Sequence, residues 1–231
     1  FGTPTRIARL RSAEYMKAND LFSQDAIPID FRISPEQLVC SHIEQLILYP
    51  GSSQVLDFAN GRVRLVAAKA DRGGLLVGQK IETLKDHVRN AEGRIAAIYR
   101  DGKAMPLKGD TVIQEEDEVF FITDRKDIRV FMNEMRKLEE PVRRVVIAGG
   151  GNIGVRLALA LEQTNQVKII ERDPIRARQI SEQLNKAIVI VGDVADEEKL
   201  LEENIDDVDV FCGLTNSEEA NILSCMLAKR L

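Results

Sequence analysis

The stretch VVIAGGGNIG, residues 145–154, is a short apolar run that ends in consecutive glycines. Gly149, Gly151 and Gly154 fit the pattern G-x-G-x-x-G, directly after a predicted strand and at the start of a predicted helix. Glycines at these positions allow a tight turn, a close approach of the backbone to phosphate, and close packing of helix on strand. The free N–H groups at the start of a helix also favour an anion. The stretch therefore predicts a nucleotide-binding turn.

The rest of the chain after Arg143 alternates between apolar runs and amphipathic segments. The predicted strands are RVVIAG (144–149), VKIIER (167–172), AIVIVGD (187–193) and DVFCGL (209–214). The first predicted helix starts at Asn152, and the three that follow span 174–185, 196–203 and 217–229. Short apolar strands separated by helices are typical of a parallel sheet that helices cover on both faces. We therefore expect a doubly wound, Rossmann-like α/β domain.

An acidic residue, Glu171, closes the second strand of this domain. A carboxylate there can accept hydrogen bonds from both ribose hydroxyls and would repel a 2′-phosphate, which favours adenosine or NAD-type ligands over NADP. The alternative is a solvated residue at a strand end. The neighbouring Arg172 could stack on adenine or stand exposed at the surface.

Two further strand ends carry polar residues. Gly192 and Asp193 follow the third strand, where adenine would lie, and Thr215 and Asn216 follow the fourth. Ligands of open α/β sheets bind at the carboxyl ends of the strands, where the strand order reverses. Thr215 and Asn216 can also cap the helix that starts near Ser217, a role compatible with ligand contact.

The segments before Arg143 predict two other parts. Residues 51–139 contain hairpin turns at Asn60-Gly61 and Asp101-Gly102 and a helix with an apolar face, a pattern typical of a small α+β domain. That face consists of Ile128, Phe131, Met132 and Met135. Residues 1–50 predict a strand, a helix capped by Ser12, a second strand, and a helix that starts at Ser34-Pro35-Glu36.

We expect residues 1–50 to be the end of an upstream Rossmann-like domain and residues 142–231 to be a second, truncated copy. The chain would then be a fragment of a tandem-repeat protein, since it opens late in one copy and stops late in the next. Arg9 and Arg11 are two apart on the first predicted strand and would share one face. They could reach a phosphate in the upstream copy or across a dimer interface, or be solvated edge charges.

Composition excludes several classes of function. The net charge of −5 leaves no basic field for nucleic acid. The apolar runs are far shorter than the ~20 residues that a membrane-spanning helix needs. The three cysteines lack CxxC spacing and are expected to be buried, reduced thiols. The two histidines have no neighbours at metal-ligand spacing, so we expect no metal site.

Catalytic residues are also hard to find in this sequence. Tyr99 and Lys103 have the Tyr-x-x-x-Lys spacing of short-chain dehydrogenases, but they flank a hairpin turn upstream of the glycine turn and would not share a helical face. Neither histidine is near the predicted cleft. We therefore expect no catalytic residues and a protein that is not an enzyme.

The chain resembles the RCK or KTN group of cytosolic potassium-transport regulators, and within it the TrkA-type Trk uptake proteins. The resemblance rests on VVIAGGGNIG, KIIERD, IVIVGD and LTNSEEANI for the nucleotide-binding half, and on RIAAIYRDGKAMPLKGDTVIQEEDEVFFI for the C-terminal module. ISPEQL and the helix after it resemble the crossover helix through which these domains dimerise. Glu115-Glu116-Asp117 departs from the family's acidic-Gly-Asp turn.

The resemblance implies a non-catalytic role. Family members bind NAD(H) or ATP/ADP and, as a homo-oligomeric dimer or tetrameric ring, regulate a Trk-type membrane potassium transporter from the cytoplasmic face of the bacterial inner membrane. The implied phosphate contacts are Gly149, Gly150, Gly151, Asn152, Ile153 and Gly154, with Glu171 at the ribose, Arg172, Gly192 and Asp193 near adenine, and Thr215 and Asn216 at the cleft. Two alternatives stay open at this point: an NAD-dependent oxidoreductase with an unrecognised substrate domain, and a non-binding oligomerisation scaffold.

Overall fold

The computed structural model describes residues 3–11, 15, 20–22, 27–59, 61–89, 91–137 and 140–231. The chain divides into two compact units, Phe1–Glu44 with Arg143–Leu231 and Gln45–Val142. The assignment of residues 1–50 to a separate upstream domain stays a prediction.

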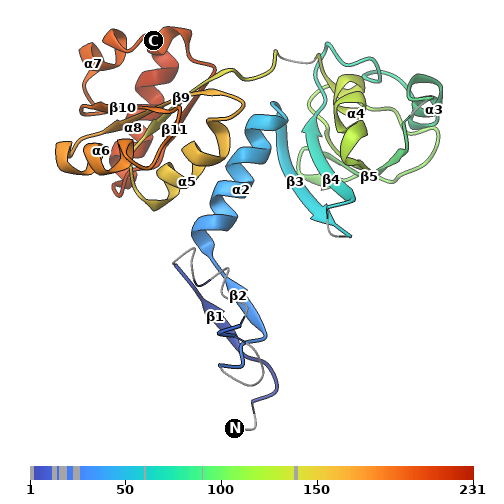
Figure 1. Ribbon diagram of the computed structural model, residues 1–231. Coiled ribbons are helices and arrows are strands. Elements are labelled where there is room, and N and C mark those ends of the chain that lie inside the picture. The colour runs from blue at the N-terminus through green and yellow to red at the C-terminus, as the bar shows by residue number, and fades with distance from the viewer. Residues whose placement is uncertain are drawn as a thin grey trace. The chain divides into compact units, whose positions relative to one another are not determined.

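A parallel sheet forms the centre of the first unit (Figure 1). Its strands are β8 (Arg144–Ala148), β9 (Gln166–Glu171), β10 (Ile188–Val191) and β11 (Val210–Gly213), in the order β10-β9-β8-β11. Its helices are α5 (Asn152–Leu161), α6 (Pro174–Ser181), α7 (Glu197–Glu202) and α8 (Glu218–Arg230), with a 3-10 turn η3 (Ile205–Asp207). From β8 the chain adds β9 and then β10 on one side of the sheet, and it then adds β11 on the other side of β8. The prediction of a doubly wound sheet is confirmed.

Helices pack on both faces of this sheet. Val146 and Ala148 of β8 pack with Leu200 of α7 and Leu227 of α8, whereas α5 and α6 lie on the opposite face (Figure 1). The expectation that every strand is covered on both faces is wrong for β10, whose Ile188 and Val191 are exposed. The reason is that β10 is an edge strand of the sheet.

Helix α6 is four residues shorter than predicted, because it ends at Ser181 rather than at 185. Glu162, at the end of α5, is only 3% exposed, and its carboxylate accepts the backbone N–H groups of Asn185, Lys186 and Ala187 at 2.8–3.1 Å. These N–H groups point at Glu162 instead of continuing the helix. The contact therefore sets where the chain turns into β10.

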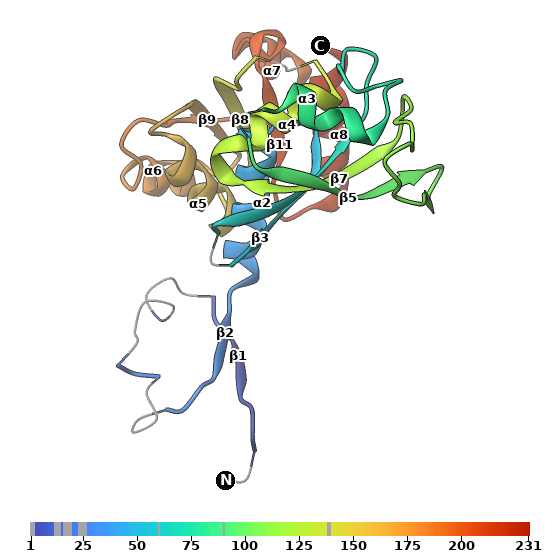
Figure 2. The ribbon, with the colours of Figure 1, turned by 90° about the vertical axis from the view of Figure 1, so that its right-hand side faces the viewer.

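The beginning of the chain contributes a two-stranded parallel sheet, β1 (Ile7–Arg9) and β2 (Phe31–Ile33), shown side by side in Figure 2. The helix α2 (Pro35–Leu48) follows, and Ser34 Oγ accepts the Gln37 N–H at 3.4 Å, as the predicted helix start requires. The helix predicted to be capped by Ser12 lies largely outside the described residues.

The second unit is an antiparallel sheet with one main helix. Its strands are β3 (Ser52–Phe58), β4 (Val63–Lys69), β5 (Gly93–Arg100), β6 (Lys103–Ala104) and β7 (Glu118–Asp124), in the order β3-β4-β7-β5-β6. Its helical segments are η1 (Ile81–Thr83), α3 (Leu84–His87), η2 (Arg125–Asp127) and α4 (Ile128–Met135). Both predicted hairpins are confirmed, although Asn60 itself lies outside the described residues.

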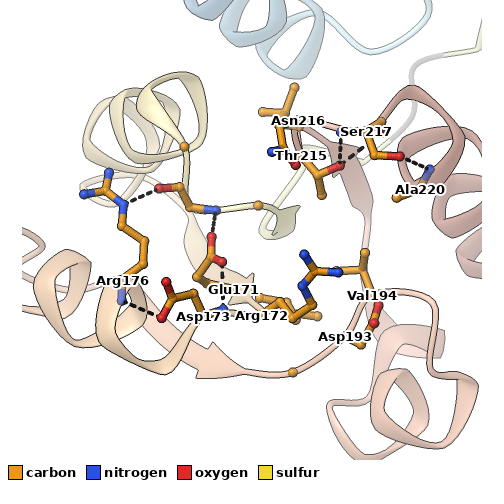
Figure 3. A pocket seen from close by; sticks show the side chains of 16 residues that line it. Glu171, Arg172, Asp173, Arg176, Asp193, Val194, Thr215, Asn216, Ser217 and Ala220 are labelled. Atoms are coloured by element: carbon orange, nitrogen blue, oxygen red, sulfur yellow. Dashed lines mark hydrogen bonds between the residues drawn. The ribbon is translucent and has the colours of Figure 1, made fainter.

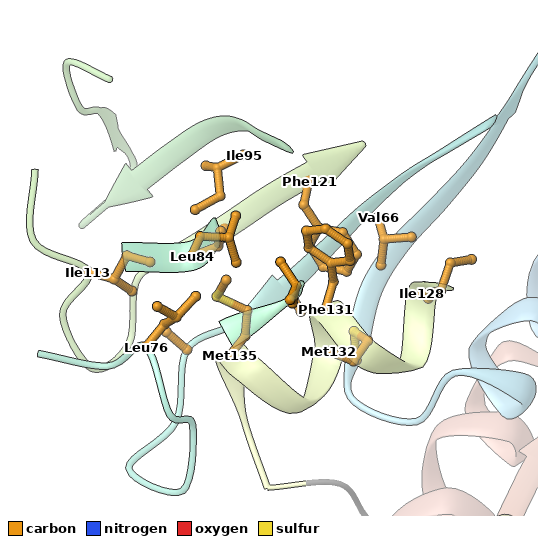
Figure 4. Packing of buried hydrophobic residues seen from close by; sticks show 14 of the residues in the cluster. Val66, Leu76, Leu84, Ile95, Ile113, Phe121, Ile128, Phe131, Met132 and Met135 are labelled. Atoms are coloured by element: carbon orange, nitrogen blue, oxygen red, sulfur yellow. The ribbon is translucent and has the colours of Figure 1, made fainter. Parts of the chain in front are cut away.

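The core of this unit lies between the sheet and α4 (Figure 4). The predicted apolar face of the helix is fully buried, and the Phe131 ring stacks on Phe121 of β7 with 5.4 Å between the ring centroids. The buried side chains of α4 include Ile128, Phe131, Met132 and Met135, as predicted from their helical spacing, and Glu134 is buried as well.

The Glu115-Glu116-Asp117 turn keeps a tight shape without the family's glycine. Glu116 takes a left-handed backbone with φ +72°, which costs a non-glycine residue about 1 kcal/mol. Asp117 is fully buried, and both of its carboxylate oxygens accept hydrogen bonds from the Arg100 guanidinium at 2.8 Å. This ion pair connects the turn to Arg100 at the end of β5, so the turn is held in place without a glycine at position 116.

All three cysteines lie within the described residues and are free. Cys40 is buried, and burial raises the pKa of the half-buried Cys212 to about 12. Cys225 is exposed, so the expectation of buried thiols is wrong for this residue of α8.

Candidate functional site

The glycine turn connects β8 to α5 at the point where the strand order reverses, beside the end of β11. Gly149 has φ +107°, and a Cβ there would lie 2.8 Å from both the Leu214 carbonyl oxygen and the Thr215 nitrogen. A Cβ on Gly154 would lie 2.1 Å from the Gly149 carbonyl oxygen, whereas a Cβ on Gly151 would meet nothing within 4 Å. Gly149 thus serves the turn, Gly154 serves helix packing, and Gly151 leaves open space at the turn.

A pocket of about 510 Å³ opens at this turn, along the carboxyl ends of the four strands (Figure 3). Its lining contains nine of the predicted site residues: Gly149, Gly150, Gly151, Glu171, Arg172, Gly192, Asp193, Thr215 and Asn216. It also contains seven residues that the sequence did not indicate: Ile170, Asp173, Arg176, Val194, Leu214, Ser217 and Ala220.

Glu171 ends β9 and faces the glycine turn. Its Oε2 accepts the Gly150 N–H at 2.8 Å, and its Oε1 accepts the Asp173 N–H at 3.0 Å. A carboxylate oxygen can accept more than one hydrogen bond. The side chain therefore supports the turn and still has acceptor capacity toward the pocket.

Arg172 and Asp193 lie on the side of the pocket away from α5. The Arg172 side chain reaches across the pocket toward Asp193 and Val194 (Figure 3). Asp193 follows β10, and its Oδ1 accepts the Ala195 N–H at 2.9 Å, which shapes the loop after the strand. A cation and a carboxylate thus stand together at this end of the pocket.

The loop after β11 forms a local hydrogen-bond network. Thr215 Oγ1 donates to Asn221 Oδ1 at 2.7 Å and accepts the Ser217 N–H at 3.2 Å, while Ser217 Oγ accepts the Ala220 N–H and caps α8. The capping role predicted as an alternative for Thr215 and Asn216 therefore belongs to Ser217. Thr215 and Asn216 remain on the pocket wall.

The remaining predicted residues lie outside the pocket lining. Asn152, Ile153 and Gly154 form the first turn of α5 behind the glycines. Arg9 pairs with Glu36 at 3.5 Å, and the Arg11 carbonyl accepts an Arg156 N–H at 2.8 Å. Arg11 lies just past the end of β1, at Arg9, and not within the strand as predicted. A role in phosphate contact stays a prediction for both.

One missed residue did carry a sequence signal. Asp173 precedes Pro174, and its Oδ1 accepts the Ile175 and Arg176 N–H groups at the start of α6. An Asp followed by Pro is a typical helix start. Arg176 gave no such signal, because its contact with the turn depends on how α6 packs.

Tyr99 and Lys103 flank the Asp101-Gly102 turn on β5 and β6, in the unit that does not contain the pocket. The part of the chain that the structure describes contains no group of three His, Cys, Asp or Glu side chains placed to hold a metal ion. Among the same residues, no helix combines the length and apolar character needed to cross a membrane.

Two glycine substitutions separate the steric roles of this turn. We expect Gly154→Ala to destabilise the domain by about 2 kcal/mol, because its methyl group would overlap the Gly149 carbonyl. Gly151→Ala should leave the melting temperature within about 1 °C of the parent's, since its methyl group meets open space, but should weaken binding of any ligand at the turn. Thermal unfolding and ligand titration of both variants test this. Equal melting temperatures for the two would contradict the packing role of Gly154.

Fold and pocket together define a Rossmann-like α/β protein with a glycine turn at the reversal of its strand order. The TrkA-N domain model matches residues 145–231, and the TrkA-C domain model matches residues 65–136. The chain is 52% identical over its whole length to the Trk system potassium uptake protein TrkA of Halomonas elongata, and 52% to that of Vibrio alginolyticus. It spans about half the length of these curated relatives, 50% and 51%.

Solved structures show the same fold at low sequence identity. The crystal structure of the GsuK RCK domain aligns with 98% of this chain and 47% of its own, with a TM-score of 0.62 and 16% identity. The GsuK channel bound to NAD aligns with 98% of this chain and 39% of its own, with a TM-score of 0.61 and 15% identity. The chain therefore contains a TrkA-N domain and a TrkA-C domain.

Proposed function

We propose that this chain is part of a nucleotide-binding regulatory subunit of a Trk-type potassium uptake system. The observation that carries the proposal is the pocket at the carboxyl ends of the strands, which is lined by an open glycine turn and by Glu171 hydrogen-bonded to that turn. Such a pairing suits the phosphate and the ribose of one adenine nucleotide. The identity to Trk system potassium uptake proteins supports the transport context.

The ligands that fit this pocket best are NAD(H) and ATP or ADP. Glu171 and the neighbouring Asp173 place two carboxylates on the ribose side. They suit a ribose with free hydroxyls and disfavour a 2′-phosphate by charge repulsion. Gly149, Gly150 and Gly151 would face the phosphates, Arg172 and Asp193 the adenine, and Thr215 and Asn216 the open side of the pocket.

Regulation by such a ligand follows from a coupling free energy. A nucleotide that binds two conformations of the protein with different affinity shifts their balance by that difference, about 1–3 kcal/mol per site. Several equivalent sites in a symmetric assembly add their effects. The bound nucleotide then acts as a signal that is not consumed.

Assembly and location complete the proposal. Leu38 and Val39 of α2 are 62% and 41% exposed, and apolar side chains on an exposed helix face are suited to pairing with a second copy. We propose a dimer or a tetrameric ring on the cytoplasmic face of the bacterial inner membrane, in contact with the potassium transporter subunit. The net charge of −5 makes nucleic acid an unsuitable partner.

Two alternatives make different predictions at the same site. An NAD-dependent oxidoreductase would need side chains free to transfer protons, whereas the side chains of Glu171, Asp173 and Thr215 already accept backbone N–H groups. A scaffold would assemble without binding nucleotide.

Calorimetric titration of the chain with NADH, NAD⁺, ATP, ADP and NADP⁺ at matched ionic strength tests the proposal. We expect binding without turnover, unequal affinities within the redox or the phosphorylation pair, and about tenfold weaker binding of NADP⁺ than of NAD⁺. Oxidation of NADH with an added carbonyl compound would favour the oxidoreductase. Intact assembly with no binding to any of the five would favour the scaffold.

A further inference from the structure

The middle residue of the glycine turn is held from both sides. Its N–H donates to Glu171 Oε2 at 2.8 Å, and its carbonyl oxygen accepts the Arg176 Nε–H at 3.1 Å (Figure 3). Two further hydrogen bonds close a ring: Asp173 N–H donates to Glu171 Oε1 at 3.0 Å, and Arg176 N–H donates to Asp173 Oδ1 at 3.3 Å. Gly150 is thus connected to the start of α6 by side chains on both sides.

This ring sets the orientation of the peptide group between Gly150 and Gly151. In a trans peptide the carbonyl oxygen and the following N–H point in opposite directions. When Arg176 holds the Gly150 oxygen, the Gly151 N–H must point away from Arg176. Gly151 has open space where a Cβ would stand, whereas Gly150 is packed against Ile180 and Glu171. The fixed N–H therefore belongs to the residue at the open side of the turn.

Three successive glycines make this constraint necessary. Glycine has the largest backbone freedom of any residue, and ordering one residue costs about 1–2 kcal/mol. A peptide group between two glycines can rotate without meeting a side chain of its own residues. Without the hydrogen bonds from Glu171 and Arg176, the Gly150–Gly151 peptide group would sample orientations in which its N–H points away from a bound anion.

We propose that Arg176 is a positioning residue that aligns the Gly151 N–H for the phosphate end of the ligand. The proposal rests on the proposed function, because it requires a phosphorylated ligand at the turn. Binding of the phosphate end then depends on the hydrogen bond from Arg176 to the Gly150 carbonyl. Binding of the nucleoside part does not depend on it.

The test is Arg176→Met, which removes the donor and the charge and keeps a long side chain. Arg178→Met is the matched control, because Arg178 lies on the same helix with a side chain that is 86% exposed. Affinities for adenosine and for ADP are measured by calorimetry. We expect Arg176→Met to weaken ADP binding about tenfold, in line with the loss of one charge-assisted hydrogen bond, and to leave adenosine binding within twofold. Arg178→Met should change neither.

A second readout separates positioning from direct phosphate contact. We expect the ¹⁵N amide signals of Gly150 and Gly151 in ligand-free Arg176→Met to broaden by conformational exchange, while those of Arg178→Met stay sharp. Sharp signals in Arg176→Met together with weak ADP binding would mean that Arg176 touches the phosphate itself, and would overturn the positioning role. Equal losses for adenosine and ADP, or no loss for either, would overturn it as well.

The same data distinguish failure of the proposed nucleotide binding from failure of the positioning role of Arg176. If the parent chain binds neither adenosine nor ADP, the nucleotide-binding proposal fails, whereas the amide signals of Gly150 and Gly151 still decide whether Arg176 orders the turn. If the parent binds both ligands equally, the turn does not read phosphate and the inference is overturned.

Discussion

Replacing Glu171 with alanine is expected to weaken nucleotide binding by about a hundredfold. The substitution removes the acceptor proposed for the ribose hydroxyls, and it releases the N–H groups of Gly150 and Asp173. Hydrogen bonds to a charged group contribute about 1.5–3 kcal/mol each, so losing one or two of them accounts for this factor. The measurement is a calorimetric titration of the variant with whichever of NAD⁺ and ADP the parent chain binds more tightly.

Two controls make the Glu171 result specific. Glu171→Gln keeps an acceptor oxygen without the charge and should lose less affinity than the alanine variant. Glu182→Ala removes a carboxylate that is 71% exposed just after the end of α6, and this variant should bind like the parent. Unchanged affinity of Glu171→Ala would mean that the ribose is held elsewhere, or that the ligand lies in another orientation.

Replacing Glu162 with alanine is expected to lower the free energy of unfolding by about 3 kcal/mol. This carboxylate is buried and accepts three backbone N–H groups and the Asn185 side-chain amide. Alanine would leave these donors without a partner inside the protein, at a cost of about 1–3 kcal/mol for each group that water cannot reach. Urea unfolding measures the loss. Glu182→Ala serves again as the exposed control and should change stability by less than about 0.5 kcal/mol.

The same residue predicts a pH dependence of stability. Hydrogen bonds from the N–H groups of Lys186, Asn185 and Ala187 lower the pKa of Glu162 from its ordinary value of 4.5 to about 2. A depressed folded-state pKa means that the contribution, on the order of 3 kcal/mol, is complete above pH 4.5 and is lost as the pH falls through 4.5 toward 2. We expect Glu162→Gln to show a smaller loss of stability than its parent over this interval. Parallel curves for the two proteins would contradict this assignment.

Much of the candidate site follows from local sequence. The glycine turn and the residues at the strand ends lie where short-range patterns place them: a glycine motif after an apolar strand, and polar residues at the carboxyl ends of parallel strands. Nine predicted residues line the pocket for this reason. Arg176 could not be found in this way, because its contact with Gly150 depends on the rotation and starting point of α6.

The differences in the fold have a related origin. The period of apolar residues predicts where α6 exists but not where it ends, since the end depends on Glu162, which is 20 residues or more distant in sequence from the N–H groups that it accepts. β1 likewise ends at Arg9, before Arg11, although the spacing of the two arginines suits one strand. Long-range hydrogen bonds decide such boundaries, and a single sequence does not display them.

The ring of hydrogen bonds around Gly150 also has a kinetic consequence. A turn that already has its binding shape before the ligand arrives requires no slow rearrangement during encounter. Association rates of related nucleotides would then be similar and limited mainly by diffusion and orientation. The differences among them would lie in how long each nucleotide stays bound. A regulator of this kind would respond to the nucleotides present in the cell through the different times for which each of them stays bound.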